Sequence, residues 1–456
     1  MSRPVGSEGA GVPAAAKPTP AAQPLAPRHP SRPAARSWIT KLSLAYLGIN
    51  IAWAGPGQVL MSPQVEWLTT NAPLWFFTSV KESNLSIIGF VAGIFALVST
   101  PLWGALSDRT RSRWGRRTPW IAIGLVVVAV TMALSGFAQS LPALLLTWVA
   151  MQTAINAVIS PMSAAIPDHV PAAQRGLVSG WYGFAYTLAV VAGTAIGTIA
   201  TAVWPSMLGI GMGYVLCAAA CVMAGIPFVL DRWERSTPRP PRASRFGWRD
   251  FIACYWIDLR VHRDFGWAWI TRFLVTLSSA IALFYLYYYL QDRVGLVRDG
   301  SDAPGLRVSD GVLILTAVYA ASVFLTVVAA GVVSDRVARR RPFVAVSAIF
   351  LSGATLIMAF VPDFGFTVVA AAILGLGTGV FTAVDFALVT EVLPAASDNG
   401  KDVGIINLAI GLPNVLAPVI AAIAVQQLGG YVGLYLLSGV LALTGGVLVY
   451  RIRGVR

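Results

Sequence analysis

The sequence predicts an all-α polytopic membrane protein with twelve transmembrane helices arranged in two pseudo-symmetric six-helix halves. Three observations support this fold class. Of the 456 residues, 56% are hydrophobic and 12% are charged, which is about half the charged share of an ordinary soluble protein. Twelve apolar stretches are each long enough to cross a bilayer as a helix. Short patterns in the first half of the chain also recur in the second half.

Composition divides the chain into five segments. Residues 1–37 are rich in Pro and Ala without apolar periodicity, which predicts a disordered tail. An N-terminal half at 38–230 and a C-terminal half at 266–450 flank an Arg- and Pro-rich linker at 231–265, and a short tail follows at 451–456. The predicted spans are 39–62, 85–107, 119–139, 141–165, 177–203, 206–230, 266–290, 310–333, 342–361, 365–390, 403–427 and 430–450.

The distribution of basic residues predicts the orientation. Of the 33 Lys and Arg residues, 28 fall on the side that holds both chain ends, and four fall in the loops of the other side. Because basic loops stay in the cytoplasm, we expect a multi-pass protein of the cytoplasmic membrane with both termini cytoplasmic. The net charge of +13 then reflects topology in a lipid bilayer. A nucleic-acid partner is not expected, since no soluble domain combines a basic face with stacking aromatics.

Two patterns repeat between the halves. GALSDR at 104–109 ends the second span, and GVVSDR at 331–336 ends the eighth, 227 residues later. DHVP at 168–171 ends the fourth span, and EVLP at 391–394 ends the tenth, 223 residues later. Two patterns at nearly one offset indicate two homologous halves, an arrangement in which secondary transporters place a small-molecule site between the repeats.

The loop after the second span carries the most specific motif, DRTRSRWGRR at 108–117, and DRVARRR at 335–341 repeats it. It resembles the signature loop of the major facilitator superfamily. With TPW at 118–120, it also resembles the glycoside–pentoside–hexuronide cation symporters and the related sucrose–proton symporters. The resemblance covers residues 38–450 and implies a transporter that works by alternating access. Span 39–62 lacks the acidic residues that these symporters often carry there, so a melibiose-type sodium site is not expected.

The resemblance implies a gate at the cytoplasmic side that latches when the site faces outward. By position, Asp108 would face the eleventh helix, and Arg109 or Arg113 would reach Asp168; these pairs would break as the protein turns inward. The second half would repeat them. Asp168 and its counterpart could instead be ordinary helix-end acids, and the motif a positive-inside anchor. The gate set is Gly104, Asp108, Arg109, Arg113, Gly115, Arg116, Asp168, Arg175, Gly331, Asp335, Arg336 and Glu391.

Two charged residues lie well inside the predicted spans, Arg272 in the seventh and Asp385 in the tenth. A charge in hydrocarbon is costly and marks a functional candidate. Their similar depth and opposite sign predict a pair, in which protonation of Asp385 would release Arg272 and couple transport to protons. A static salt bridge, or an Arg272 side chain that extends to the lipid headgroups, explains the pattern equally well.

Uncharged polar and aromatic residues near midspan are candidates for binding the cargo. Amides offer both donors and acceptors to hydroxyl-rich solutes, and aromatic rings can stack on a sugar. Interhelical hydrogen bonding and lipid-facing packing are the alternatives. For Tyr285, Tyr287, Tyr288 and Tyr289, a belt at the membrane interface is the expectation. The binding candidates are Asn50, Trp53, Gln58, Gln152, Asn156, Tyr182, Tyr186 and Asn414.

These patterns predict proton-coupled uptake of a sugar or glycoside, with proton-driven efflux of a small organic metabolite or drug as the alternative. A membrane-embedded enzyme or a sensor on a carrier fold is a third class. An enzyme would need a nucleophile–base pair or a metal cluster, but the spans hold no histidine, and no GxxxxGK[ST] run occurs. Catalytic residues, a metal site and a cofactor are therefore not expected.

Overall fold

Long helices account for the predicted spans in the computed structural model, which describes residues 33–231, 233–236, 263–337, 340–391 and 399–452. Most of the predicted tail and linker lie outside these residues. Eleven of the described helices are long and apolar enough to cross a membrane. The remaining predicted span, 39–62, corresponds to residues 36–71, a helical stretch that an internal break divides. The all-helical fold class is confirmed.

In the described residues, each half contains six long helical stretches. The N-terminal half contains α1 (Arg36–Gly55), η1 (Pro56–Leu60), α2 (Met61–Asn71), α3 (Lys81–Arg109), α4 (Thr118–Gly136), α5 (Leu141–His169), α6 (Ala172–Val203) and α7 (Ser206–Leu230), followed by η2 (Trp233–Ser236). The C-terminal half contains α9 (Arg263–Phe284), α10 (Leu286–Tyr289), η3 (Leu290–Val294), α11 (Val308–Val337), α12 (Arg341–Phe360), α13 (Phe364–Glu391), α14 (Asn399–Gln427), α15 (Tyr431–Leu448) and η4 (Val449–Arg451).

The first span runs beyond its predicted end because the helical stretch continues past Pro56 as η1 and α2. Proline lacks the N–H that continues an α-helical ladder, and the chain widens here into the π-helical turn η1 before it resumes as α2. Gly55 makes close packing possible at this break, since a Cβ there would lie 2.8 Å from the backbone oxygen of Gly193. The small residues let α1 and α6 pack closely.

The seventh span ends earlier than predicted, at Phe284, where the chain turns into α10 and η3. The expectation of an interfacial belt at Tyr285, Tyr287, Tyr288 and Tyr289 is wrong, because all four side chains are 0–3% exposed. Their hydroxyl groups donate hydrogen bonds inside the protein, for example from Tyr288 to the backbone oxygen of Ser62. Tyr285 and Tyr288 thus bond to the N-terminal half, while Tyr287 and Tyr289 bond within the C-terminal half.

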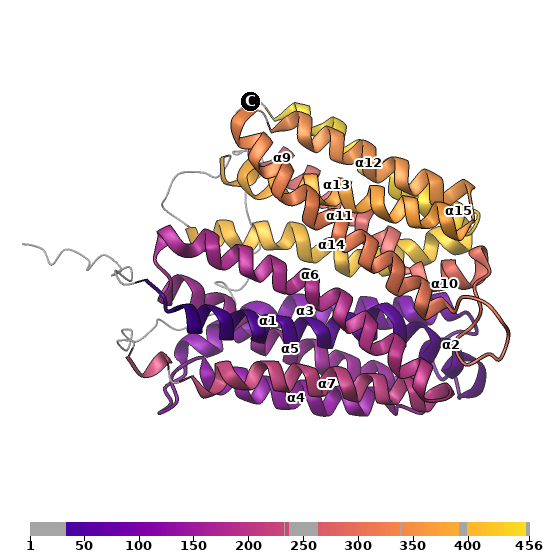
Figure 1. Cartoon of the computed structure of the whole chain (residues 1–456), viewed down its shortest axis with the longest axis horizontal. Helices are drawn as coiled ribbons and strands as arrows, with labels where there is room; N and C mark the ends of the chain where they lie inside the picture. Colours follow the sequence, from indigo (N-terminus) through magenta and orange to yellow (C-terminus); the bar gives the residue numbers. More distant parts are fainter. Residues whose placement is uncertain (1–32, 232, 237–262, 338–339, 392–398, 453–456) are drawn as a thin grey trace, which may run out of the picture.

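The two halves lie side by side, with helices from indigo to magenta in one and from orange to yellow in the other (Figure 1). Across the boundary, α3 packs against α14 and α6 packs against α11. By order in the two halves, α3 corresponds to α11 and α6 to α14. The two contacts are therefore equivalent, which fits the predicted pseudo-symmetry. Both described chain ends and the 110–117 loop lie at one end, at the left in Figure 1, which we call the basic end. Residues 72–80 and 285–307 lie at the opposite end.

Candidate functional site

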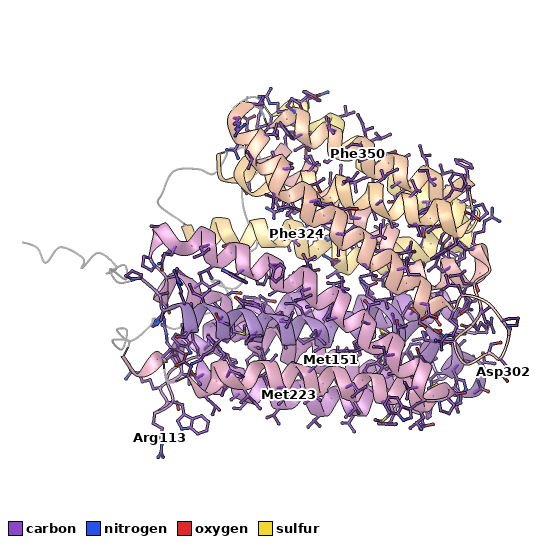
Figure 2. All side chains as sticks on the ribbon, viewed as in Figure 1. Arg113, Met151, Met223, Asp302, Phe324 and Phe350 are labelled. Atoms are coloured by element: carbon purple, nitrogen blue, oxygen red, sulfur yellow. The ribbon has the colours of Figure 1, made fainter. Side chains whose placement is uncertain are left out.

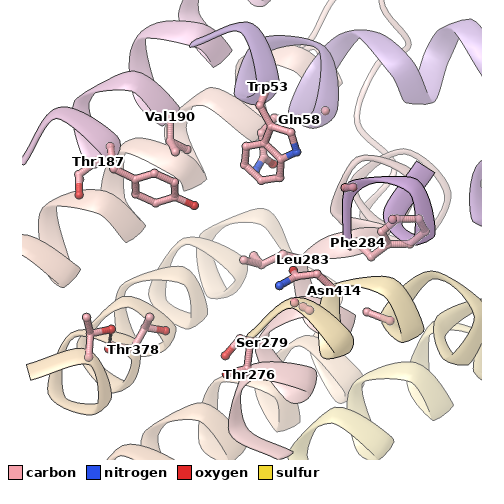
Figure 3. Close-up of a pocket in the computed structure, with 18 of the residues that line it drawn as sticks. Trp53, Gln58, Thr187, Val190, Thr276, Ser279, Leu283, Phe284, Thr378 and Asn414 are labelled. Carbon is pink, nitrogen blue, oxygen red and sulfur yellow. Dashed lines mark hydrogen bonds between the residues drawn. The ribbon is translucent and has the colours of Figure 1, made fainter. Parts of the chain in front are cut away.

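A cavity of about 1450 Å³ lies between the two halves. Its walls come from α1, α3, α5 and α6 on one side and from α9, α11, α13 and α14 on the other. The lining extends to Asp108, one residue before the end of α3, whose side chain is 50% exposed. The cavity therefore opens toward the basic end. Figure 3 shows Trp53 and Gln58 facing Asn414 and Ser279 across it.

Six of the eight predicted binding residues line this cavity. They are Trp53, Gln58, Gln152, Asn156, Tyr186 and Asn414. Asn50 and Tyr182 are not among the lining residues, so their prediction as binding residues is not supported by their placement. The Asn50 amide donates to the backbone oxygen of Tyr46 at 2.7 Å, and the Tyr182 ring packs edge-on against Tyr46 at 4.5 Å between centroids. Tyr182 therefore packs in the α1–α6 contact, and the Asn50 amide bonds within α1.

The amide side chains in the cavity differ in their hydrogen-bond partners. Asn156 donates to the backbone oxygen of Ala96 and to the Ser99 hydroxyl at 3.1 and 3.2 Å, so it joins α5 to α3, as the interhelical alternative expects. Asn414 donates to the backbone oxygen of Ile410 at 2.8 Å. Gln58 makes no hydrogen bond to a described residue, and its amide faces the cavity (Figure 3). Gln58 is therefore free to bind a solute, and Gln152, whose Oε1 atom has no hydrogen-bond partner among the described residues, is a second such amide in the lining.

Hydroxyl side chains of the C-terminal half complete the lining, and the sequence analysis missed them. Ser279, Thr378 and Thr382 each donate to the backbone oxygen four residues earlier, at 2.8–3.2 Å. Such back-bonding makes Ser and Thr unremarkable in an apolar helix, so their sequence carries no signal of a site. In this arrangement their oxygen atoms can still accept a hydrogen bond from a solute.

Charge is nearly absent from this cavity. Among the described side chains that line it, Asp108 at the mouth is the one acidic or basic residue. The Trp53 indole is 37% exposed and offers an open aromatic face. No group of three or more His, Cys, Asp or Glu among the described residues is arranged to hold a metal ion. The cavity therefore offers hydrogen bonds and aromatic surface to an uncharged solute.

The predicted gate motif forms a cluster of ion pairs at the basic end. Arg117 is buried, with 3% of its side chain exposed, and lies 2.6 Å from Asp168 and 3.5 Å from Asp108. Arg116 also pairs with Asp168 and lies 3.7 Å from Asp108. Burial lowers the pKa of the Arg117 guanidinium, and Asp168 acts in the opposite sense. Asp168 is therefore the principal partner of a buried cation and not an ordinary helix-end acid.

The prediction that Arg109 or Arg113 reaches Asp168 is wrong. Arg109 is the last residue of α3, and Arg113 lies in the turn with its side chain pointing away from the helices (Figure 2). Arg116 and Arg117 follow the turn and precede α4, which packs on α5 beside Asp168. Position after the turn, and not proximity in sequence to Asp108, decides which arginines reach the acid.

The ion pairs of the motif are formed although the cavity opens toward the basic end. The resemblance implied that they would break when the cavity opens on this side. All four charged residues belong to α3, the 110–117 loop and α5, within one half. A movement of one half against the other does not have to separate them.

Arg175, another residue of the predicted gate set, contributes differently, because it donates to the backbone oxygens of Pro167 and Val170 at 3.3 Å and caps α5.

Glu234 in η2 supports the motif loop, a contact that no pattern in the sequence indicates. Its buried carboxylate accepts hydrogen bonds from the backbone N–H groups of Arg117 and Thr118 at 2.9–3.1 Å and from the Thr118 hydroxyl. A carboxylate at a helix N-terminus satisfies free N–H groups and the helix dipole. Gly115 has φ +105°, and a Cβ there would collide with Glu234. Glycine is therefore required at this turn.

The repeat of the gate in the second half stays a prediction. Asp335 and Glu391 have side chains outside the described residues. Arg336 is exposed. Gly104 and Gly331 differ in packing, since a Cβ at Gly104 would lie 3.2 Å from the Ser160 hydroxyl, whereas at Gly331 it would meet no atom within 4 Å. Close packing therefore constrains the glycine of the first motif.

The predicted pairing of Arg272 with Asp385 is confirmed. The Arg272 Nε lies 3.1 Å from an oxygen of Asp385, and each residue is 8% exposed. One guanidinium nitrogen of Arg272 and the hydroxyl of the adjacent Thr271 are buried without a hydrogen-bond partner. The pair joins α9 to α13 within the C-terminal half and does not line the central cavity. Proton binding here would therefore act on the cavity through helix positions.

A helical bundle with paired halves, and between them a largely apolar cavity with scattered amide and hydroxyl groups, is typical of a membrane transport protein. The chain belongs to the Major Facilitator Superfamily, whose family model matches residues 44–306 and 301–456.

Similar proteins include transporters of several kinds. A general alpha-glucoside permease from Schizosaccharomyces pombe is 24% identical over 226 residues, which cover 46% of this chain and 38% of that protein. An uncharacterized symporter from Synechocystis is 42% identical over 60 residues, 12% of this chain and 11% of that protein. The matches thus span well under half of these relatives. The structure of the nucleoside transporter NupG has the same fold, with a TM-score of 0.66 at 12% identity over 91% of this chain and 98% of that one.

Proposed function

We propose that this protein takes up a neutral sugar or glycoside across the cytoplasmic membrane together with protons, by alternating access. The observation that carries the proposal is the central cavity, where a free amide, back-bonded hydroxyls and an open indole face one another across the two halves. Sugars present hydroxyl groups that need both donors and acceptors, and their faces stack on aromatic rings.

The charge and size of the cavity support the substrate class. An ionic cargo would find one acidic or basic side chain among the described lining residues, Asp108 at the mouth, and deeper in the cavity its charge would be desolvated at a large cost. The volume of about 1450 Å³ exceeds the ~300–1,000 Å³ of common ligand pockets, which leaves room for a disaccharide-sized solute with water. The similarity to a symporter and to an alpha-glucoside permease also supports the proposal.

Proton-driven efflux of an organic metabolite or drug is the second candidate, favoured by one observation. Part of the lining is apolar, with the rings of Phe184 and Phe324 in contact at 6.2 Å between centroids and with Val327 and Val328 one helical turn further along α11. An amphipathic drug could pack against this surface, while a sugar would pass it in water.

Transport of a panel of sugars and drugs by purified protein in proteoliposomes, with and without a proton gradient, tests the proposal. We expect one or more neutral sugars to accumulate only with the gradient. Gln58→Ala and Trp53→Ala should each raise the half-saturating sugar concentration about tenfold, because each removes roughly 1.4 kcal/mol of binding. Trp181→Ala is the matched control, since this exposed tryptophan lies outside the cavity lining. Gradient-driven movement of drugs without sugars would favour efflux.

The proposed direction requires the basic end to face the cytoplasm. A reporter enzyme that is active only outside the cytoplasm should be silent when fused to the C-terminus and active when inserted after Asp302, an exposed residue of the loop at the opposite end (Figure 2). The 28 basic residues on one side give this expectation through the positive-inside rule. The reverse pattern of activity would overturn the orientation.

A further inference from the structure

Ionised and hydroxyl-bearing side chains join the two halves at the opposite end of the bundle, where the cavity stops. We call this group the clasp and define it by six residues. Its members are Glu66, Lys81, Tyr288, Gln291, Asp292 and Arg298. The first two belong to α2 and α3 of the N-terminal half, and the other four to α10, η3 and the loop after it in the C-terminal half.

Lys81 is the centre of the clasp. Its ammonium group lies 2.8 Å from an oxygen of Asp292 and 3.4 Å from an oxygen of Glu66. It also lies 4.7 Å from the centroid of the Tyr288 ring, within the range of a cation–π contact. One cation therefore binds a carboxylate of each half and an aromatic face at the same time.

Glu66 receives a second set of bonds from the C-terminal half. The Gln291 amide donates to both of its carboxylate oxygens at 3.0 Å, and Arg298 lies 3.0 Å from one of them. The Tyr288 hydroxyl donates to the backbone oxygen of Ser62 at 2.9 Å. Four residues of one half thus hold two charged side chains and the backbone of the other.

The chemistry of this contact suits a barrier that opens and closes. The side chains of Lys81 and Glu66 are 18% and 20% exposed, so the charges are partly shielded but water lies next to them. Charge-assisted hydrogen bonds hold the closed form, and solvation of the same charges compensates for their loss in the open form. Separation of an apolar contact would instead expose hydrophobic surface to water, and no solvation of charges would compensate for that cost.

We infer that the clasp is the barrier that separates the central cavity from the solvent at the opposite end, with the Lys81–Asp292 pair as its principal contact. Opening of the cavity at that end requires these bonds to break. The inference rests on the alternating-access part of the proposed function and not on the identity of the cargo or the use of protons.

Labelling of one cavity cysteine from each side of the membrane tests the clasp. Leu283→Cys places the reporter in the cavity wall (Figure 3), and the unmodified chain gives the background of the native cysteines. A membrane-impermeant maleimide is applied to intact cells and to inside-out vesicles. Labelling of the parent should be fast from one side and slow from the other. Asp292→Asn should raise the slow rate roughly fivefold, as expected for a partly exposed charge pair, and Lys81→Gln should act alike.

Asp302→Asn is the matched control, an exposed aspartate of the same loop outside the clasp, and should leave the slow rate unchanged. The fast-side rate and the amount of protein in the membrane report folding. A Glu66→Cys/Gln291→Cys pair, when oxidised, should suppress slow-side labelling below that of the parent until it is reduced. Parental slow rates in both charge variants, or unchanged labelling after cross-linking, would overturn the inference. Because no cargo is needed, a failed sugar assay leaves this test intact.

Discussion

Asparagine in place of Asp385 is expected to abolish accumulation of cargo against a gradient and to leave exchange of cargo between the two sides intact. The carboxyl group of Asp385 is bonded to Arg272 at 3.1 Å, and both residues are buried. A guanidinium keeps its proton under all physiological conditions, so Asp385 is the member of the pair that can change its charge. Exchange moves no net protons, and therefore does not need that change.

The pair makes further variants informative. Asp385→Glu keeps a titratable group and should retain part of the accumulation, which makes it the control for Asp385→Asn. Arg272→Ala leaves a buried acid without its cation, a change that typically costs about 3–5 kcal/mol, so less protein should reach the membrane. The double variant Arg272→Ala/Asp385→Asn should recover the amount of folded protein but not accumulation.

Uptake of labelled cargo into proteoliposomes, with and without a proton gradient, separates these outcomes from simple unfolding. Counterflow exchange in the same vesicles reports whether the cavity still binds and moves its cargo. If Asp385→Asn still concentrates cargo when the gradient is applied, the proton binds elsewhere, and the Arg272–Asp385 pair is a static bridge between α9 and α13.

The pairing of these two residues was predictable because helix geometry is regular. Each residue advances a helix by 1.5 Å, so the distance of Arg272 and Asp385 from the ends of their spans fixed their depths. Apolar length likewise predicted the number of spans, and the patterns that recur at nearly one offset predicted the two halves. Rules of this kind need no knowledge of which helices touch.

The arginines of the motif loop show where such rules stop. The sequence places Arg109 and Arg113 nearest to Asp108, but the turn at Gly115 and the cap from Glu234 direct Arg116 and Arg117 to Asp168 instead. Glu234 lies 117 residues from Arg117. A turn conformation and a distant capping residue together decide the contact, and neither is encoded by local periodicity.

The tyrosines after α9 and the hydroxyls of the cavity were misjudged for a related reason. A membrane-interface belt and a buried contact between two halves have the same composition, and only the bend at Tyr285 distinguishes them. Ser279 and Thr378 look like ordinary back-bonded residues of apolar helices. Their part in the cavity follows from the way the two halves face one another.

Replacement of Asp168 by asparagine is expected to destabilise the folded protein far more than the same change at Asp108, although both acids belong to one cluster. Asp168 lies 2.6 Å from the buried Arg117 and also pairs with Arg116, while Asp108 is half exposed and no closer than 3.5 Å to either. Loss of Asp168 leaves the buried guanidinium with Asp108, at 3.5 Å, as its remaining ion-pair partner among the described residues. We expect Asp168→Asn to lower the free energy of unfolding by about 2–3 kcal/mol, and Asp108→Asn by no more than about 0.5 kcal/mol.

Thermal unfolding of the detergent-solubilised protein measures this difference, and transport rates measure its consequence. Asp108→Asn should slow turnover strongly with little change in sugar affinity, because its charge belongs to the motif cluster at the cavity mouth and the binding groups lie deeper. The double variant Arg117→Gln/Asp168→Asn should regain stability relative to Asp168→Asn, since it removes the uncompensated charge, but it should not regain turnover. Equal destabilisation by Asp108→Asn and Asp168→Asn would show that Arg117 depends on both acids alike, and that the shorter contact does not decide which acid holds the cluster.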